Sequence, residues 1–205
     1  MKPVFISQNE WISFFEEIKK ESDRAAAILV AAYIDSLLRA KLETVFSKGN
    51  AEIRRKLFDD SHGAFATLST KVDAAYCLGW LEPDMFHDIG VIRKIRNQFG
   101  HRIHGLTLEE PKIQALVDKL RVPHRLFYDW GKVKCGATKD HAGIVLFTVE
   151  PADNVETVSD LPPGFIFRWA ASWVLGVLAK NLGVSFYDTN AKPLSFRLIA
   201  DPEDE

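Results

Sequence analysis

Apolar residues recur at helical spacing as far as Leu120, and this pattern predicts a bundle of helices. The predicted helix at residues 23–46 is apolar on nearly every side from Ala25 to Ile34, which is typical of a helix at the centre of a bundle. Asp35 ends that run, and Arg39 and Glu43 follow at helical steps, so the three side chains are expected to form a ladder. The other predicted helices cover residues 7–20, 51–58, 65–79, 84–103, 109–120 and 164–182.

The pattern changes after Pro123. Residues 143–150 form a short apolar run bounded by turn signals, and residues 194–200 alternate between apolar and polar side chains, so both favour strands. We therefore predict a mainly α fold, a helical bundle with a small β hairpin or sheet in the C-terminal third. Residues 1–125 are expected to form the bundle. Residues 126–205 are expected to form an α+β extension that packs on the bundle and is not an independent domain.

Composition limits the classes of function. The 205 residues are 47% hydrophobic and 26% charged, which is enough apolar material for one sizeable core. The net charge is -2, whereas phosphate contacts usually require a basic surplus, so a nucleic-acid partner is possible but not supported by net charge. Cys77 and Cys135 lie far apart, which excludes a disulfide framework and a cysteine-based zinc site. We expect no cofactor, no metal, no membrane segment and a cytoplasmic location.

The best candidate for a DNA-recognition helix is residues 51–58, because Arg54, Arg55 and Lys56 are adjacent there. Acidic residues flank this cluster on both sides, at Glu52 and at Asp59. A solvated amphipathic helix is therefore the favoured interpretation, and direct DNA recognition is the minor one.

Residues 91–105 carry the most informative pattern. On a helix, Ile92, Ile95, Phe99 and Ile103 form an apolar stripe, and a polar row lies beside it. One interpretation makes the row structural, as part of a polar network that spans several helices. The residues of that network are Asp35, Lys71, Asp73, Arg93 and Arg96.

The second interpretation is catalytic. Arg96 would hold phosphate oxygens, and His101 would act as a general base or acid on RNA, with a second histidine supplied by the other subunit of a dimer. The spacing of Arg96, Asn97 and His101 resembles the Arg-x(4–6)-His signature of HEPN domains. That resemblance implies a metal-independent endoribonuclease in which these three residues are catalytic.

A wider resemblance covers more than half of the chain. Residues 21–38 (ESDRAAAILVAAYIDSLL), 63–81 (GAFATLSTKVDAAYCLGWL) and 92–103 (IRKIRNQFGHRI) are similar, in this order, to the mannitol operon repressor family. The resemblance implies an all-helical bundle and a role in transcriptional repression. We expect a regulator that forms a homodimer and acts mainly through protein–protein contacts. Under this interpretation the chain is not an enzyme.

Overall fold

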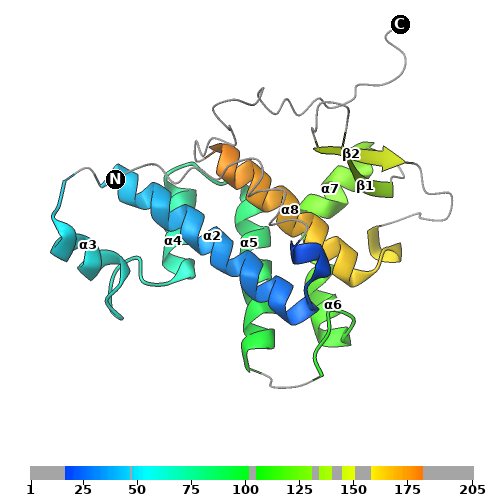
Figure 1. Cartoon of the computed structure of the whole chain (residues 1–205), viewed down its shortest axis with the longest axis horizontal. Coiled ribbons are helices and arrows are strands. Elements are labelled where there is room, and N and C mark those ends of the chain that lie inside the picture. The colour runs from blue at the N-terminus through cyan, green and yellow to red at the C-terminus, as the bar shows by residue number, and fades with distance from the viewer. Residues whose placement is uncertain are drawn as a thin grey trace, which may run out of the picture.

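The computed structural model describes residues 17–46, 48–101, 105–130, 134–139, 145–150 and 158–181. Residues 17–20 are helical and precede the longer helices and the two strands that are labelled in Figure 1. The helices are α2 (Asp23–Val45), α3 (Ala51–Phe58), α4 (Leu68–Cys77), α5 (Pro83–His101), α6 (Pro111–Val117), α7 (Arg121–Trp130) and α8 (Pro163–Asn181), with a short 3-10 helix η1 (Val158–Asp160). The prediction of a mainly helical protein is confirmed.

Helix α2 lies at the centre of the fold. The Ser22 hydroxyl accepts a hydrogen bond from the Ala25 N–H at 3.2 Å and caps the helix, as expected for serine at this position. Helices α4, α5 and α8 all pack against α2. The side chains that α2 buries include Ala26, Ala27, Val30, Ala31, Ile34, Leu37, Leu38 and Leu42. Small residues on successive turns let neighbouring helices approach closely on several sides.

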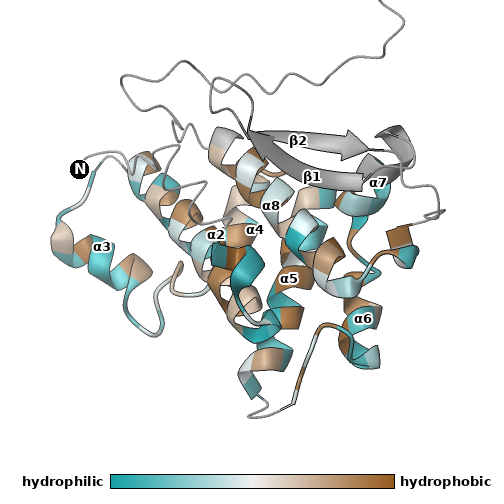
Figure 2. Ribbon diagram, turned by 45° about the vertical axis from the view of Figure 1, so that its right-hand side comes forward, coloured by the Kyte–Doolittle hydropathy of each residue, from teal (hydrophilic) through white to brown (hydrophobic). Residues whose placement is uncertain are grey.

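Helix α8 belongs to the same hydrophobic core as α2 and α5. Its buried side chains, from Ile166 to Ala179, join one cluster with Ile34 of α2 and Phe99 of α5. Figure 2 shows hydrophobic residues along α5 and α8 and hydrophilic ones along much of α3. A separation of the chain at residue 125 stays a prediction, but α8 contributes to the core of the bundle itself.

Two strands follow α7. β1 (Lys134–Lys139) and β2 (Val145–Glu150) pair antiparallel, with Lys134 opposite Glu150 and Lys139 opposite Val145. The sequence suggested strands at 143–150 and 194–200, and the second of these lies outside the described residues. A sheet in which these two predicted segments pair with each other therefore stays a prediction.

Helix α7 was not predicted, because Pro123 was taken as a boundary. Proline is tolerated in the first turn of a helix, where backbone N–H groups have no partner within the helix. Asp88 of α5 supplies acceptors for that turn from a distant part of the sequence, as described below. Within the part of the chain that the structure describes, no helix is long and apolar enough to cross a membrane.

Candidate interaction surface

The outer face of α5 carries the polar row that the sequence indicated. α5 runs unbroken from Pro83 to His101, and its buried side chains include Ile89, Ile92, Ile95 and Phe99. On the opposite side of the helix, Phe86, Gly90, Arg93, Lys94 and Asn97 follow at helical spacing and are exposed or half-buried. The core packing of α5 therefore holds this row in place on the surface.

The cations of this row have few partners. Among the described residues, no hydrogen bond or ion pair joins Arg93 or Lys94 to another side chain. Arg96 donates a hydrogen bond to the Asn97 side-chain oxygen at 3.1 Å. The sequence has no carboxylate between residues 89 and 101. The C-terminal half of α5 is thus a cationic surface.

A surface pocket of about 230 Å³ lies between α4 and α5. Arg93, Lys94 and Gly90 of α5 line it, as does Asp73 of α4. Phe86 also lines the pocket and stacks on Tyr76, with ring centroids 4.4 Å apart. The pocket therefore combines an aromatic wall with two cations, the His87 ring and one carboxylate.

An aromatic side chain is exposed beside this pocket. Tyr76, which stacks on Phe86, is 41% exposed. Leu78, which follows the last residue of α4, is 47% exposed. Sequence reasoning did not identify these residues or Phe86, because the pocket forms only when two helices meet. The polar row on α5 was the one local signal for this surface.

The residues of the predicted polar network are not all brought together. Lys71 of α4 donates to both carboxylate oxygens of Asp35 on α2, at 2.7 and 2.8 Å. The Lys71 side chain is only 3% exposed, while Asp35 remains in contact with solvent. Asp73 and Arg93 line the pocket, and Arg96 bonds to Asn97. The structure thus joins Lys71 to Asp35, and a wider network stays a hypothesis.

The expected ladder of Asp35, Arg39 and Glu43 is corrected in part. Arg39 donates to Glu43 at 2.9 Å, but its other bond goes to Asp59, beyond α3. Asp35 faces Lys71 instead. Because a buried lysine ammonium needs an opposite charge, the tertiary pair replaces the expected pair along the helix.

The proposed catalytic residues all lie on α5. Arg96 and His101 are exposed, and Asn97 is half-buried. The pairing of two such helices across a dimer stays a hypothesis. In the described ranges, no group of three or more His, Cys, Asp or Glu side chains is placed to hold a metal ion.

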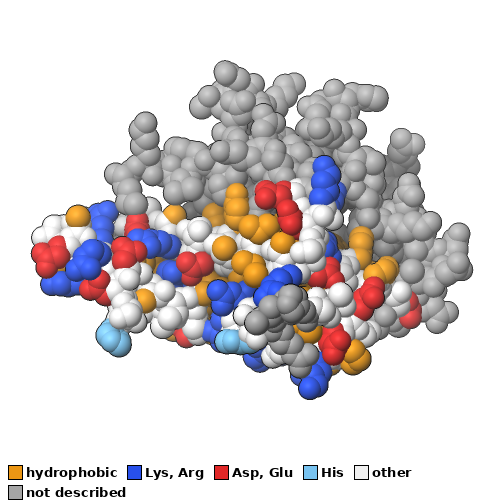
Figure 3. Space-filling view, turned by 60° about the horizontal axis from the view of Figure 1, so that its bottom comes forward, with side chains coloured by type: hydrophobic (Ala, Val, Ile, Leu, Met, Phe, Trp, Pro, Cys, Tyr) orange, Lys and Arg blue, Asp and Glu red, His pale blue; other side chains and the backbone are white. Residues whose placement is uncertain are grey.

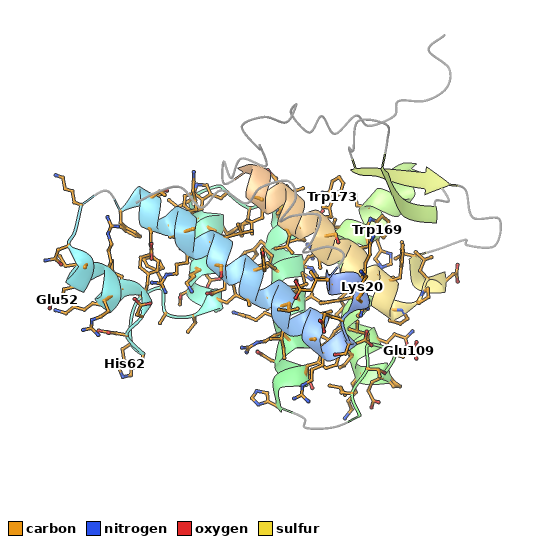
Figure 4. The ribbon with its side chains drawn as sticks, in the orientation of Figure 1. Lys20, Glu52, His62, Glu109, Trp169 and Trp173 are labelled. Atoms are coloured by element: carbon orange, nitrogen blue, oxygen red, sulfur yellow. The ribbon has the colours of Figure 1, made fainter. Side chains whose placement is uncertain are left out.

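Two of the three basic residues of α3, Arg55 and Lys56, are paired within their own segment. Arg55 bonds to Asp60 at 2.6 Å, and Lys56 bonds to Glu52 at 2.9 Å. Figure 3 shows acidic and basic side chains intermixed at the end of the molecule where α3 lies. Figure 4 shows Glu52 on α3, which protrudes from the rest of the bundle. These pairs compete with phosphate binding, and so they weigh against α3 as a recognition helix.

An ion pair also fastens the end of α3 to α2. The hydrogen bond from Arg39 lowers the pKa of Asp59 from its usual value, and the same bond raises the pKa of Arg39. The Arg39 guanidinium also lies over the Phe58 ring, 5.5 Å from its centroid. Both contacts hold the C-terminal end of α3 against α2.

Asp88 is a buried carboxylate that sequence reasoning missed. It is 0% exposed and accepts the backbone N–H groups of Arg121 and Val122, each at 2.8 Å. The His87 ring nitrogen Nδ1 lies 3.0 Å from the same carboxylate. Asp88 therefore caps the N-terminus of α7 from α5. The feature of the sequence that could have identified it is a carboxylate directly beside the apolar stripe of this helix.

Arg168 of α8 is a second missed anchor. Its guanidinium donates to the backbone oxygens of Ile18 and Glu21, at 3.2 and 2.9 Å, and to the Asp23 carboxylate at 3.0 Å. Asp23 also accepts the Leu108 N–H at 2.9 Å. Arg168 and Asp23 thus join α8 to the start of α2.

Two tryptophans lie near Arg168 on α8. Trp169 and Trp173 are on the side away from Glu109 (Figure 4), and both are half-buried.

The chain resembles a solved structure in fold. No protein-family model matches the chain, and no curated protein matches it in sequence. A chain of the X-ray structure of the MtlR–HPr complex from Escherichia coli has a similar fold, with a TM-score of 0.50 and 14% sequence identity. The match covers 86% of this chain and 96% of that chain. At this identity the likeness shows a distant MtlR-like fold.

Proposed function

We propose that this protein is a regulator that acts by binding another protein. The supporting observation is the fold shared, over most of both chains, with a chain of the MtlR–HPr complex. HPr is accordingly the first partner to test. The resemblance of three sequence blocks to the mannitol operon repressor family supports the same role in transcriptional regulation. A cytoplasmic location and a homodimer belong to this proposal.

The surface chemistry agrees with protein contacts better than with DNA contacts. Arg55 and Lys56 of α3 are neutralised locally, and the net charge of the chain is -2. The aromatic pair of Tyr76 and Phe86 lies at the pocket between α4 and α5, and Tyr76 is exposed. Aromatic residues and arginine are enriched at protein interfaces.

The test is a biosensor titration of the immobilised protein with purified HPr. The proposal predicts saturable binding of HPr and no binding of lysozyme, a small protein of unrelated fold. Absence of HPr binding, combined with a gel shift of operator DNA at physiological salt, contradicts the proposal. Light scattering of the free protein tests the homodimer separately.

No contact among the described residues favours the ribonuclease hypothesis. Arg96 bonds to its neighbour Asn97, and His101 is exposed at the end of α5. Incubation of RNA with wild type and with the His101→Ala variant tests it directly.

A further inference from the structure

We propose that the pocket between α4 and α5 binds an acidic segment of a partner protein that presents one large apolar side chain. The apolar side chain would enter the pocket against Phe86, and the carboxylates would pair with Arg93 and Lys94. This inference rests on the proposed function, because it assigns the surface through which a protein partner is held. The fold likeness does not indicate this surface, which is identified from charge, exposure and shape.

Charge determines the class of partner. Arg93 and Lys94 line the pocket, and Arg96 lies one helical turn from Arg93. Among the described residues, neither Arg93 nor Lys94 is paired with a carboxylate, and Asp73 is the one acidic side chain on the pocket wall. Unpaired cations around a docking site attract acidic segments and disfavour basic ones.

The aromatic wall gives the second requirement. Phe86 is half-buried and stacks on Tyr76, so the two rings form one platform at the edge of the pocket. Tyr76 is 41% exposed, so this platform is open to a partner. The volume of about 230 Å³ is below the roughly 300–1,000 Å³ of typical small-molecule sites. It fits one anchoring side chain of a peptide better than a complete cofactor.

Gly90 supplies a third observation. It lies within α5 and lines the pocket, and an added Cβ there meets no heavy atom within 4 Å. Glycine in a helix costs about 0.5–1 kcal/mol relative to alanine. The packing of this chain therefore does not explain the glycine, whereas close approach of a bound segment does. Gly100, on the same helix, has equal space around its Cβ but lies outside the pocket.

Two other occupants fit less well. In a symmetric contact, a second copy would bring Arg93 and Lys94 against the same cations, which is unfavourable. Nucleic acid would gain from these cations, but the Asp73 carboxylate on the wall does not suit a phosphate backbone. An acidic protein segment uses both the cations and the apolar platform.

The test uses fluorescence anisotropy with three labelled synthetic peptides. In the acidic probe, one Phe is flanked by Asp and Glu. The basic probe has Lys at each acidic position, and the third probe has Ser in place of Phe. Each is titrated with the full chain, and with its Arg93→Glu/Lys94→Glu, Gly90→Leu and Gly100→Leu variants. Circular dichroism of each variant first checks that it is folded.

The proposal predicts that the acidic probe binds and that the basic and Ser probes bind at least about tenfold more weakly. The double charge reversal and Gly90→Leu should each raise the Kd of the acidic probe about tenfold or more. Gly100→Leu, about 15 Å further along the helix, should change the Kd less than about twofold. Equal binding of the acidic and basic probes, or an unchanged Kd for Gly90→Leu, overturns the proposal.

Further measurements separate the alternatives. HPr binding that is identical in all variants, with no acidic-probe binding, overturns this inference and leaves the proposed function intact. Acidic-probe binding with the expected variant effects, without HPr binding, supports the surface and contradicts HPr as the partner. Two outcomes would assign another occupant to the pocket and overturn the inference. In the first, the protein is a dimer and Gly90→Leu converts it to a monomer. In the second, single-stranded RNA displaces the acidic probe, whereas excess unlabelled acidic peptide does not.

Discussion

Replacing Asp88 with alanine tests how the bundle positions α7. The carboxylate is 0% exposed and accepts two backbone N–H groups of the first turn of α7. Pro123, the third residue of that helix, has no N–H group to satisfy. Asp88 thus serves the donors that the start of the helix would otherwise leave without a partner.

The expected cost follows from the two bonds. A hydrogen bond to a charged group contributes about 1.5–3 kcal/mol, and the bond from the buried Val122 N–H should approach that value. The Arg121 N–H is only partly buried and regains water, so its loss should cost about 1 kcal/mol. The sum is about 3 kcal/mol, or roughly 6–12 °C in Tm for a protein of this size.

Urea unfolding at neutral pH, followed by circular dichroism, measures this change. Asp84→Ala is the matched control, because Asp84 lies one turn earlier on α5 and also pairs with α7, through Arg125 at 2.9 Å and Arg121 at 3.6 Å. Both pairs reach solvent and together should contribute less than about 1 kcal/mol. A loss for Asp88→Ala no larger than that of Asp84→Ala would refute the capping role.

Four further predictions concern other contacts. Lys71→Ala should lower stability by about 2–3 kcal/mol, and Lys71→Met should recover part of that loss because it restores the buried stem; urea unfolding checks both. Arg168→Lys should lower Tm, because a lysine cannot reproduce the forked contacts to the start of α2, and calorimetry measures the shift. Asp59→Asn should destabilise the protein above pH 3.8, the usual pKa of this carboxyl, and the difference from wild type should vanish as pH falls through the lowered folded pKa; urea titrations across this range are the check. Wild type and His101→Ala should leave RNA equally intact in metal-free buffer, and faster cleavage by wild type would revive the ribonuclease hypothesis.

Local patterns were sufficient to predict most helices. The helix predicted at residues 51–58 is α3, and the one predicted at 23–46 ends one residue earlier, at Val45. In both segments the capping residue directly precedes the apolar pattern, so all the signals for the helix are local in the sequence. α7 could not be predicted in this way, because its capping carboxylate is Asp88, far away in the sequence.

The same reason limits prediction of the site. The cationic row on α5 follows from helical spacing alone, and the structure places it on the surface. The partner of Asp35 could not be deduced, because Lys71 and nearby Arg39 satisfy the same charge rule and only the packing of α4 on α2 decides between them. The Tyr76–Phe86 platform likewise requires two helices to meet.

The central claim is that the chain works by binding a protein partner, and calorimetric titration with HPr tests it most directly. The account predicts saturable heat of binding for HPr, with none for lysozyme. Operator DNA should give no shift at physiological salt. A flat HPr titration together with a specific DNA shift would contradict the account.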